Sequence, residues 1–132
     1  MKKIITTSLL IALLIPNASA QAATKSLKTK ANKASCNSIK TNYQSKVMSN
    51  WSNGLASDQD VLKEIDLNID ILAAKQKSTT GKIKTTIASW ITAEKNTKIA
   101  LTSKNVEAIT AAMNLKISSI TNFDKLCKSI EK

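Results

Sequence analysis

The sequence contains no histidine among its 132 residues, all of its basic residues are lysine, and it has only two glycines, one proline and 3% aromatic residues. Histidine is the usual proton shuttle at neutral pH and the commonest metal ligand, and arginine binds phosphate in a bidentate manner. Without them, most catalytic mechanisms are difficult to build. The scarcity of glycine, proline and aromatics also disfavours strands, hairpins and tight turns. The composition predicts an all-α protein that is not an enzyme.

The acidic residues do not form a convincing metal site. Five of the nine acids lie between Asp58 and Asp70, with carboxylates four residues apart, but this segment lacks a dedicated calcium loop. A solvated helix face explains the spacing more simply. Haem and di-iron sites are disfavoured by the absence of histidine, so we expect no metal or cofactor. Glu94 is expected at the surface, paired with Lys98 one helical turn later.

Residues 1–22 are typical of a secretory signal peptide. Two lysines near the start precede an apolar stretch from Leu9 to Ile15, and Ala18 to Ala20 supply small residues for cleavage after Ala20 or Ala22. Residues 23–132 then form a single mature domain in the periplasm or the extracellular medium. In such an oxidising compartment Cys36 and Cys127, the only two cysteines, are expected to form one structural disulfide.

Apolar side chains recur every three or four residues along four segments of the mature chain, as they do on one face of a helix. The first helix is expected to end near Asn53, while residues 23–35 upstream of its stripe are expected to fray. Ser57 is a good N-cap for the second helix, Gly81 closes the turn after it, and Ser103 is expected to cap the fourth. In chain order, the apolar residues of the four segments are Cys36, Ile39, Tyr43, Val47 and Trp51; Leu62, Ile65, Ile69 and Leu72; Ile83, Ile87, Trp90, Ile91 and Leu101; and Val106, Ile109, Met113, Ile117, Ile120, Phe123, Cys127 and Ile130.

The disulfide decides whether the second and third segments are separate helices or one kinked helix. Cys36 lies roughly 27 Å before the end of its helix and Cys127 roughly 36 Å into the last one, at 1.5 Å per residue. A disulfide requires α-carbons within about 7 Å of each other. Only an up-down-up-down order brings both cysteines to one end. We therefore predict a four-helix bundle.

Basic charge is concentrated in the first helix and the segment before it. Residues 22–57 contain six lysines and no acid, whereas residues 58–80 carry more acids than lysines. Such a helix could contact an envelope polymer, lipid headgroups at the membrane periphery or an acidic protein. The alternative is a solubilising face without a partner. Nucleic acid is disfavoured by the absence of arginine and the few aromatics. The candidate lysines are Lys25, Lys28, Lys30, Lys33, Lys40 and Lys46.

The two tryptophans admit two interpretations. Trp51, at the end of the first stripe, could lie at the rim of the bundle and anchor a partner, as tryptophans often do at interfaces. The alternative, which the helical spacing favours, places both Trp51 and Trp90 in the core.

These features lead to one functional expectation with an alternative. We expect an exported, non-enzymatic binding or accessory protein of the bacterial envelope, whose partner is a protein or an anionic envelope component. The alternative is a cationic protein that binds membranes or envelope polymers through its lysine-rich first helix. A small-molecule carrier would additionally need a lined cavity.

Overall fold

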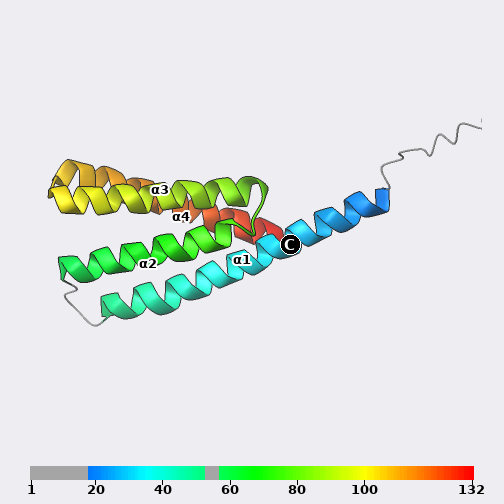
Figure 1. Ribbon diagram of the computed structural model, residues 1–132, viewed down its shortest axis with the longest axis horizontal. Helices are drawn as coiled ribbons and strands as arrows, with labels where there is room; N and C mark the ends of the chain where they lie inside the picture. Colours follow the sequence, from blue (N-terminus) through cyan, green and yellow to red (C-terminus); the bar gives the residue numbers. More distant parts are fainter. Residues whose placement is uncertain (1–17, 53–56) are drawn as a thin grey trace, which may run out of the picture.

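The computed structural model describes the backbone of residues 18–52 and 57–132, and the side chains of residues 24–42 and 57–132. Four helices account for nearly all of it: α1 (Ala18–Ser52), α2 (Asp58–Gln76), α3 (Gly81–Ser103) and α4 (Val106–Glu131). Successive helices run in opposite directions (Figure 1). The predicted all-α, four-helix architecture is therefore confirmed. Within the described ranges, none of the helices combines the length and apolar character needed to cross a bilayer.

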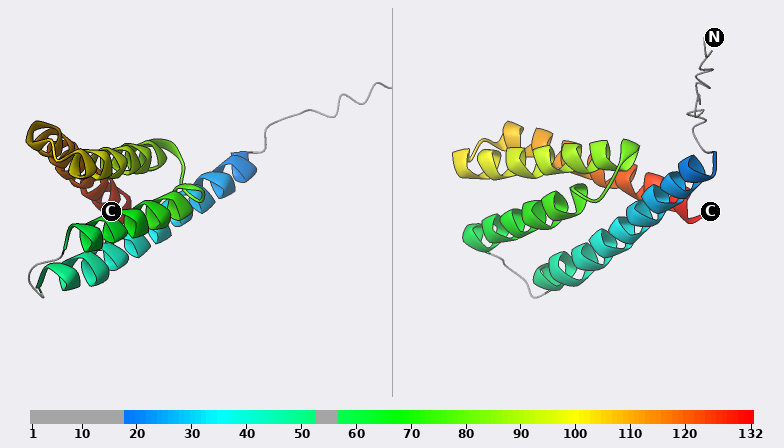
Figure 2. Two further views of the ribbon diagram at one scale, coloured as in Figure 1. Left: turned by 60° about the vertical axis from the view of Figure 1, so that its left-hand side comes forward. Right: turned by 45° about the vertical axis from the view of Figure 1, so that its right-hand side comes forward.

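The four helices do not pack equally. The α3–α4 pair has the most extensive contact and α2 packs on α3, whereas α1 touches α2 and α4 over smaller areas. Figures 1 and 2 show that α1 and the end of α4 converge at one end of the molecule, while the amino-terminal part of α1 projects beyond the other helices. We call the end where α1 and α4 meet the disulfide pole.

The core is built from all four helices around this pole. The ring centroids of Trp90 and Phe123 lie 5.5 Å apart at an interplanar angle of 59°, a favourable aromatic arrangement. The cluster of buried residues consists of Cys36, Ile39, Leu72, Ile83, Ile87, Trp90, Phe123 and Cys127.

The start of α2 and the turn after it follow the sequence prediction. Ser57 and Asp60 form a capping box, in which the Ser57 hydroxyl accepts a hydrogen bond from the Asp60 amide and the Asp60 carboxylate accepts one from the Ser57 amide. The chain turns after Gln76, and Gly81 adopts a φ of 59° at the start of α3. Glycine populates this left-handed region without steric cost. Helices α2 and α3 are thus separate.

The boundary between α3 and α4 differs from the prediction. Ser103 is the last residue of α3, and its hydroxyl donates back to the Ala100 carbonyl. Asn105 caps α4 instead, because its side-chain oxygen accepts a hydrogen bond from the Ala108 amide at 3.0 Å. Lys104 between them takes a left-handed conformation, with φ of 54°. The expected cap at Ser103 was therefore wrong by two residues.

Helix α1 extends much further upstream than its apolar stripe. It begins at Ala18, so the helix includes the expected cleavage positions and the segment 23–35 that was expected to fray. Its last helical residue is Ser52, one residue before the predicted end, and residues 53–56 lie outside the described residues, as does 1–17 of the predicted signal peptide.

The apolar stripe of α4 is only half covered. Phe123 and Cys127 are buried, but Val106 is 74% exposed and Ile117 57% exposed. These two members of the predicted stripe therefore face solvent. The reason is the unequal packing, since α4 lies chiefly on α3 and meets α1 at the disulfide pole.

Candidate binding surface

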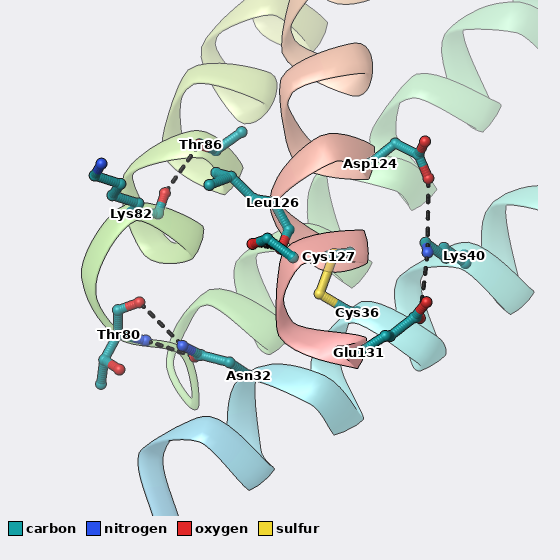
Figure 3. Close-up of a disulfide and its surroundings, with 11 residues drawn as sticks. Asn32, Cys36, Lys40, Thr80, Lys82, Thr86, Asp124, Leu126, Cys127 and Glu131 are labelled. Carbon is teal, nitrogen blue, oxygen red and sulfur yellow. Dashed lines mark hydrogen bonds and ion pairs between the residues drawn. A yellow bond between two sulfur atoms is a disulfide. The ribbon is translucent and has the colours of Figure 1, made fainter. Parts of the chain in front are cut away.

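The disulfide fixes α1 to the end of α4, as predicted. The α-carbons of Cys36 and Cys127 are 5.7 Å apart, within the range that a disulfide requires. Both cysteines are almost completely buried, and Figure 3 shows the bridge enclosed between the two helices. Because the bridge is formed and shielded, neither sulfur is available as a nucleophile or metal ligand.

Two polar side chains of α1 hold the turn between α2 and α3. The Asn32 side chain accepts a hydrogen bond from the Thr80 amide at 3.0 Å, and its Nδ2 donates to the Thr80 carbonyl at 3.4 Å (Figure 3). The Ser35 and Ser78 hydroxyls are 3.2 Å apart. Thr80 is the N-cap residue of α3 and makes no side-chain capping bond of its own. Asn32 therefore fixes the backbone of the residue before α3 from another helix, which the local sequence did not reveal.

Lys40, one of the candidate binding lysines, forms intramolecular ion pairs at the disulfide pole. Its Nζ is 3.6 Å from Asp124 and 3.5 Å from Glu131, both on α4 (Figure 3). The pKa of Asp124 is lowered, first by a hydrogen bond from Lys128 and then by the positive charges of Lys128 and Lys40. The charge of Lys40 is thus already matched within the protein.

The other described lysines of α1 are placed differently. We call residues 24–33 the α1 extension; the side chains from Thr24 to Lys30 are all exposed, and the helix meets the bundle only from Ala31 and Asn32 onward. This segment projects beyond the other helices in Figure 1. The only large apolar side chain on it, Leu27, is 67% exposed. Its four lysines form no ion pair with any described acid; they are Lys25, Lys28, Lys30 and Lys33.

These four lysines do not stabilise the helix that carries them. Lys25 and Lys28, and likewise Lys30 and Lys33, are three residues apart, where like charges cost roughly 0.2–0.5 kcal/mol per pair. Helix stability therefore gives no reason for this cluster of cations.

Glu94 lies in the core, contrary to the predicted surface pair with Lys98. Its carboxylate is fully buried, accepts a hydrogen bond from Trp90 Nε1 at 3.0 Å and lies 3.1 Å from Lys116 Nζ. Glu94 follows Trp90 by four residues and so shares its inward face. Lys98 instead reaches Asp66 on α2, at 2.6 Å. The second oxygen of Glu94, Oε2, has no hydrogen-bond partner within the described part of the chain.

The remaining candidate residues fall into two groups. Trp90 is a core residue, as its helical spacing predicted. The side chains of Trp51 and Lys46 lie outside the described residues, so their proposed binding roles stay predictions. Across 24–42 and 57–132, no three acids or cysteines converge in a way that could hold a metal ion.

Two hollows lie among the residues that the structure describes, a small cavity and a larger surface groove. The cavity, between α1, α2 and Trp90, has a volume of about 10 Å³, which is too small for an organic ligand. The groove is larger, about 380 Å³, and runs along α3 and α4 between Ile99 and Leu115. No protein-family model, curated protein or solved structure matches this chain. Its function has to be argued from its own residues.

Proposed function

We propose that this protein is an exported, non-enzymatic binding protein that attaches to an anionic surface of the bacterial envelope through its α1 extension. The observation that supports this most directly is the set of four exposed lysines on a helix segment that projects beyond the other helices, none of them paired with a described acid. The extension combines accessibility with an unbalanced charge, which is what attraction to an anionic surface requires.

Two features support export. The first 22 residues have the charged start, apolar stretch and small residues of a signal peptide. The buried Cys36–Cys127 disulfide is the kind of bond that persists in oxidising compartments. With cleavage at the expected positions, the α1 extension becomes the amino-terminal arm of the mature protein.

The arrangement of the extension favours a surface over a specific pocket. Its lysines are distributed around the helix, and beside Leu27 it carries no large apolar side chain that could seat in a partner. Each lysine close to an anionic membrane contributes about 1 kcal/mol. Four of them together contribute about 4 kcal/mol, or roughly a thousandfold in affinity, at low salt.

The test is binding of the mature chain, residues 23–132, to vesicles with 30% anionic lipid and to isolated cell-envelope polymer. One variant replaces Lys25, Lys28, Lys30 and Lys33 with glutamine. The matched control replaces four exposed lysines elsewhere, so that both variants have the same net charge; these are Lys77, Lys82, Lys84 and Lys95.

The extension variant should lose binding by about two to three orders of magnitude at low salt, whereas the control should keep most of it, because the extension projects beyond the other helices and can approach a surface directly. Wild-type binding should weaken steeply as salt rises above 0.1 M, where charges are screened beyond about 10 Å. Equal losses in both variants would show that net charge alone acts, and wild-type binding that is insensitive to salt would overturn the proposal.

A further inference from the structure

Asn68 occupies a position in the buried stripe of α2 whose neighbours on the same helix face are apolar. Ile65 and Leu72, three residues before it and four after it, are buried, and Asn68 itself is only 6% exposed. A polar group that is removed from water without a hydrogen bond destabilises the fold, so buried amides are nearly always paired. Asn68 Nδ2 has no hydrogen-bond partner among the residues that the structure describes. This donor therefore requires an explanation.

The small cavity described above adjoins this donor. It lies between α1 and α2, which run side by side in Figures 1 and 2, and its volume is about 10 Å³. A space of this size holds one water molecule and nothing larger. Glu94 Oε2, the other unpartnered atom, does not line it. The cavity wall carries two amide side chains, Asn42 and Asn68, among the larger side chains of Ile39, Ile71, Leu72 and Trp90.

The second amide, Asn42, reaches the cavity from α1. Its Nδ2 donates a hydrogen bond to the Ser38 carbonyl at 2.9 Å, so the acceptor of this side chain is the amide oxygen, which has two lone pairs. Asn68 thus brings a donor to the cavity from α2, and Asn42 brings an acceptor from α1. A water molecule both accepts and donates hydrogen bonds, and buried waters make two to four of them.

From these observations we infer that the cavity is a binding site for one ordered water molecule, which accepts a hydrogen bond from Asn68 Nδ2 and donates one to the side-chain oxygen of Asn42. Such a bridge is nearly as favourable as a direct hydrogen bond. It joins α1 to α2 about 9 Å along the helix from Cys36. Helix α1, whose contacts with its neighbours are small, is thereby held at a second point beyond the disulfide. The inference does not depend on the binding function proposed above.

The experiment detects the water by NMR cross-relaxation in the mature chain, labelled with ¹⁵N and ¹³C. Wild type should show cross-peaks from the water resonance to the Asn68 side-chain amide and to the methyl groups of Ile39 and Ile71. A long-lived bound water gives cross-peaks of opposite sign in laboratory-frame and rotating-frame spectra. Exchange of amide protons with solvent gives the same sign in both, so the two processes are distinguished.

Two matched variants test the role of Asn68. Asn68→Leu removes the donor and fills its place with an apolar side chain, so the water cross-peaks to Ile39 and Ile71 should disappear. Asn37→Leu makes the same change at an exposed position of α1 and should retain them. In a double-mutant cycle, Asn42→Leu and Asn68→Leu together should lower the melting temperature by less than the sum of their separate effects, because either change alone already removes the bridge.

Circular dichroism checks that each variant remains folded. Cross-peaks of opposite sign in wild type and Asn37→Leu, with none in Asn68→Leu, support the inference. A wild type without such cross-peaks overturns it, and this result does not depend on any variant folding. Cross-peaks that persist in Asn68→Leu also overturn it, as does a rise in the melting temperature of Asn68→Leu, which would show that the cavity is dry and the amide unpaired.

Discussion

Removing the Cys36–Cys127 disulfide should destabilise this protein more than any other single covalent change. The bridge closes a loop with a sequence separation of 91 residues. In the chain-entropy model such a loop restricts the unfolded chain by about 4.6 kcal/mol at 25 °C. The unfolding entropy of a mature chain of about 110 residues is about 0.23 kcal/mol/K, so the melting temperature should fall by about 20 °C. Two buried sulfurs are lost as well, which adds to the effect.

The assay compares thermal unfolding, followed by circular dichroism, of the wild type and of Cys36→Ala/Cys127→Ala. Hydrogen exchange should show where the loss occurs: α1 contacts its neighbours over the smallest areas, so its amides between Asn32 and Asn42 should lose protection first, while those around Trp90 in α3 remain protected. A melting temperature lowered by less than 5 °C would refute the entropic argument. Uniform loss of protection in α1 and α3 would refute the weak attachment of α1.

Three further predictions concern polar groups. Lys116→Met should destabilise the fold by about 3 kcal/mol, because it leaves the Glu94 carboxylate buried without its cation. Adding Glu94→Gln to that variant should restore most of the lost stability. A double-mutant cycle measured by urea unfolding that finds no coupling between the two residues would contradict this pairing. Asn32→Ala should cost about 1–2 kcal/mol through the two hydrogen bonds to the α2–α3 turn, whereas Asn37→Ala, at an exposed position on the same helix, should cost little in the same denaturation experiment. The pKa of Asp60 is lowered chiefly by its side-chain hydrogen bond with Ser57. The stability that the ionised carboxylate contributes is therefore fully present above the pKa of Asp60 in the unfolded chain. It is lost as the pH falls through the lower pKa of Asp60 in the folded protein. The difference in melting temperature between wild type and Asp60→Asn should therefore shrink between pH 5 and pH 2, and a constant difference would argue against the capping box.

The main architecture could be predicted because it depends on local periodicity and one covalent constraint. Helical spacing identified the four segments, Ser57 marked the start of α2, and Gly81 marked the start of α3. The pairing of Cys36 with Cys127 then fixed the direction of each helix, since only antiparallel first and last helices bring the two residues within reach.

What could not be predicted depends on contacts between residues distant in sequence. Asn32 hydrogen-bonds the backbone of Thr80, 48 residues later in the chain, and no local pattern signals this. Glu94 has the spacing of a surface ion pair with Lys98, but tertiary packing turned it toward Trp90 and Lys116. The exposure of Ile117 likewise reflects how little of α4 is covered by α1, which periodicity does not report.

The position of the bridge also determines how the molecule would carry mechanical load. Cys36 lies four residues after Asn32, where the extension leaves the bundle, so tension applied at the tip of α1 would reach the sulfur–sulfur bond within about one helical turn. From there it would enter α4 close to its carboxyl end. The hydrogen bonds of Asn32 and Ser35 would pass part of the load to the α2–α3 turn, and the far ends of the helices would stay outside the path. A protein tethered by this arm would therefore carry much of the pull on a covalent bond rather than on the non-covalent contacts of α1 alone.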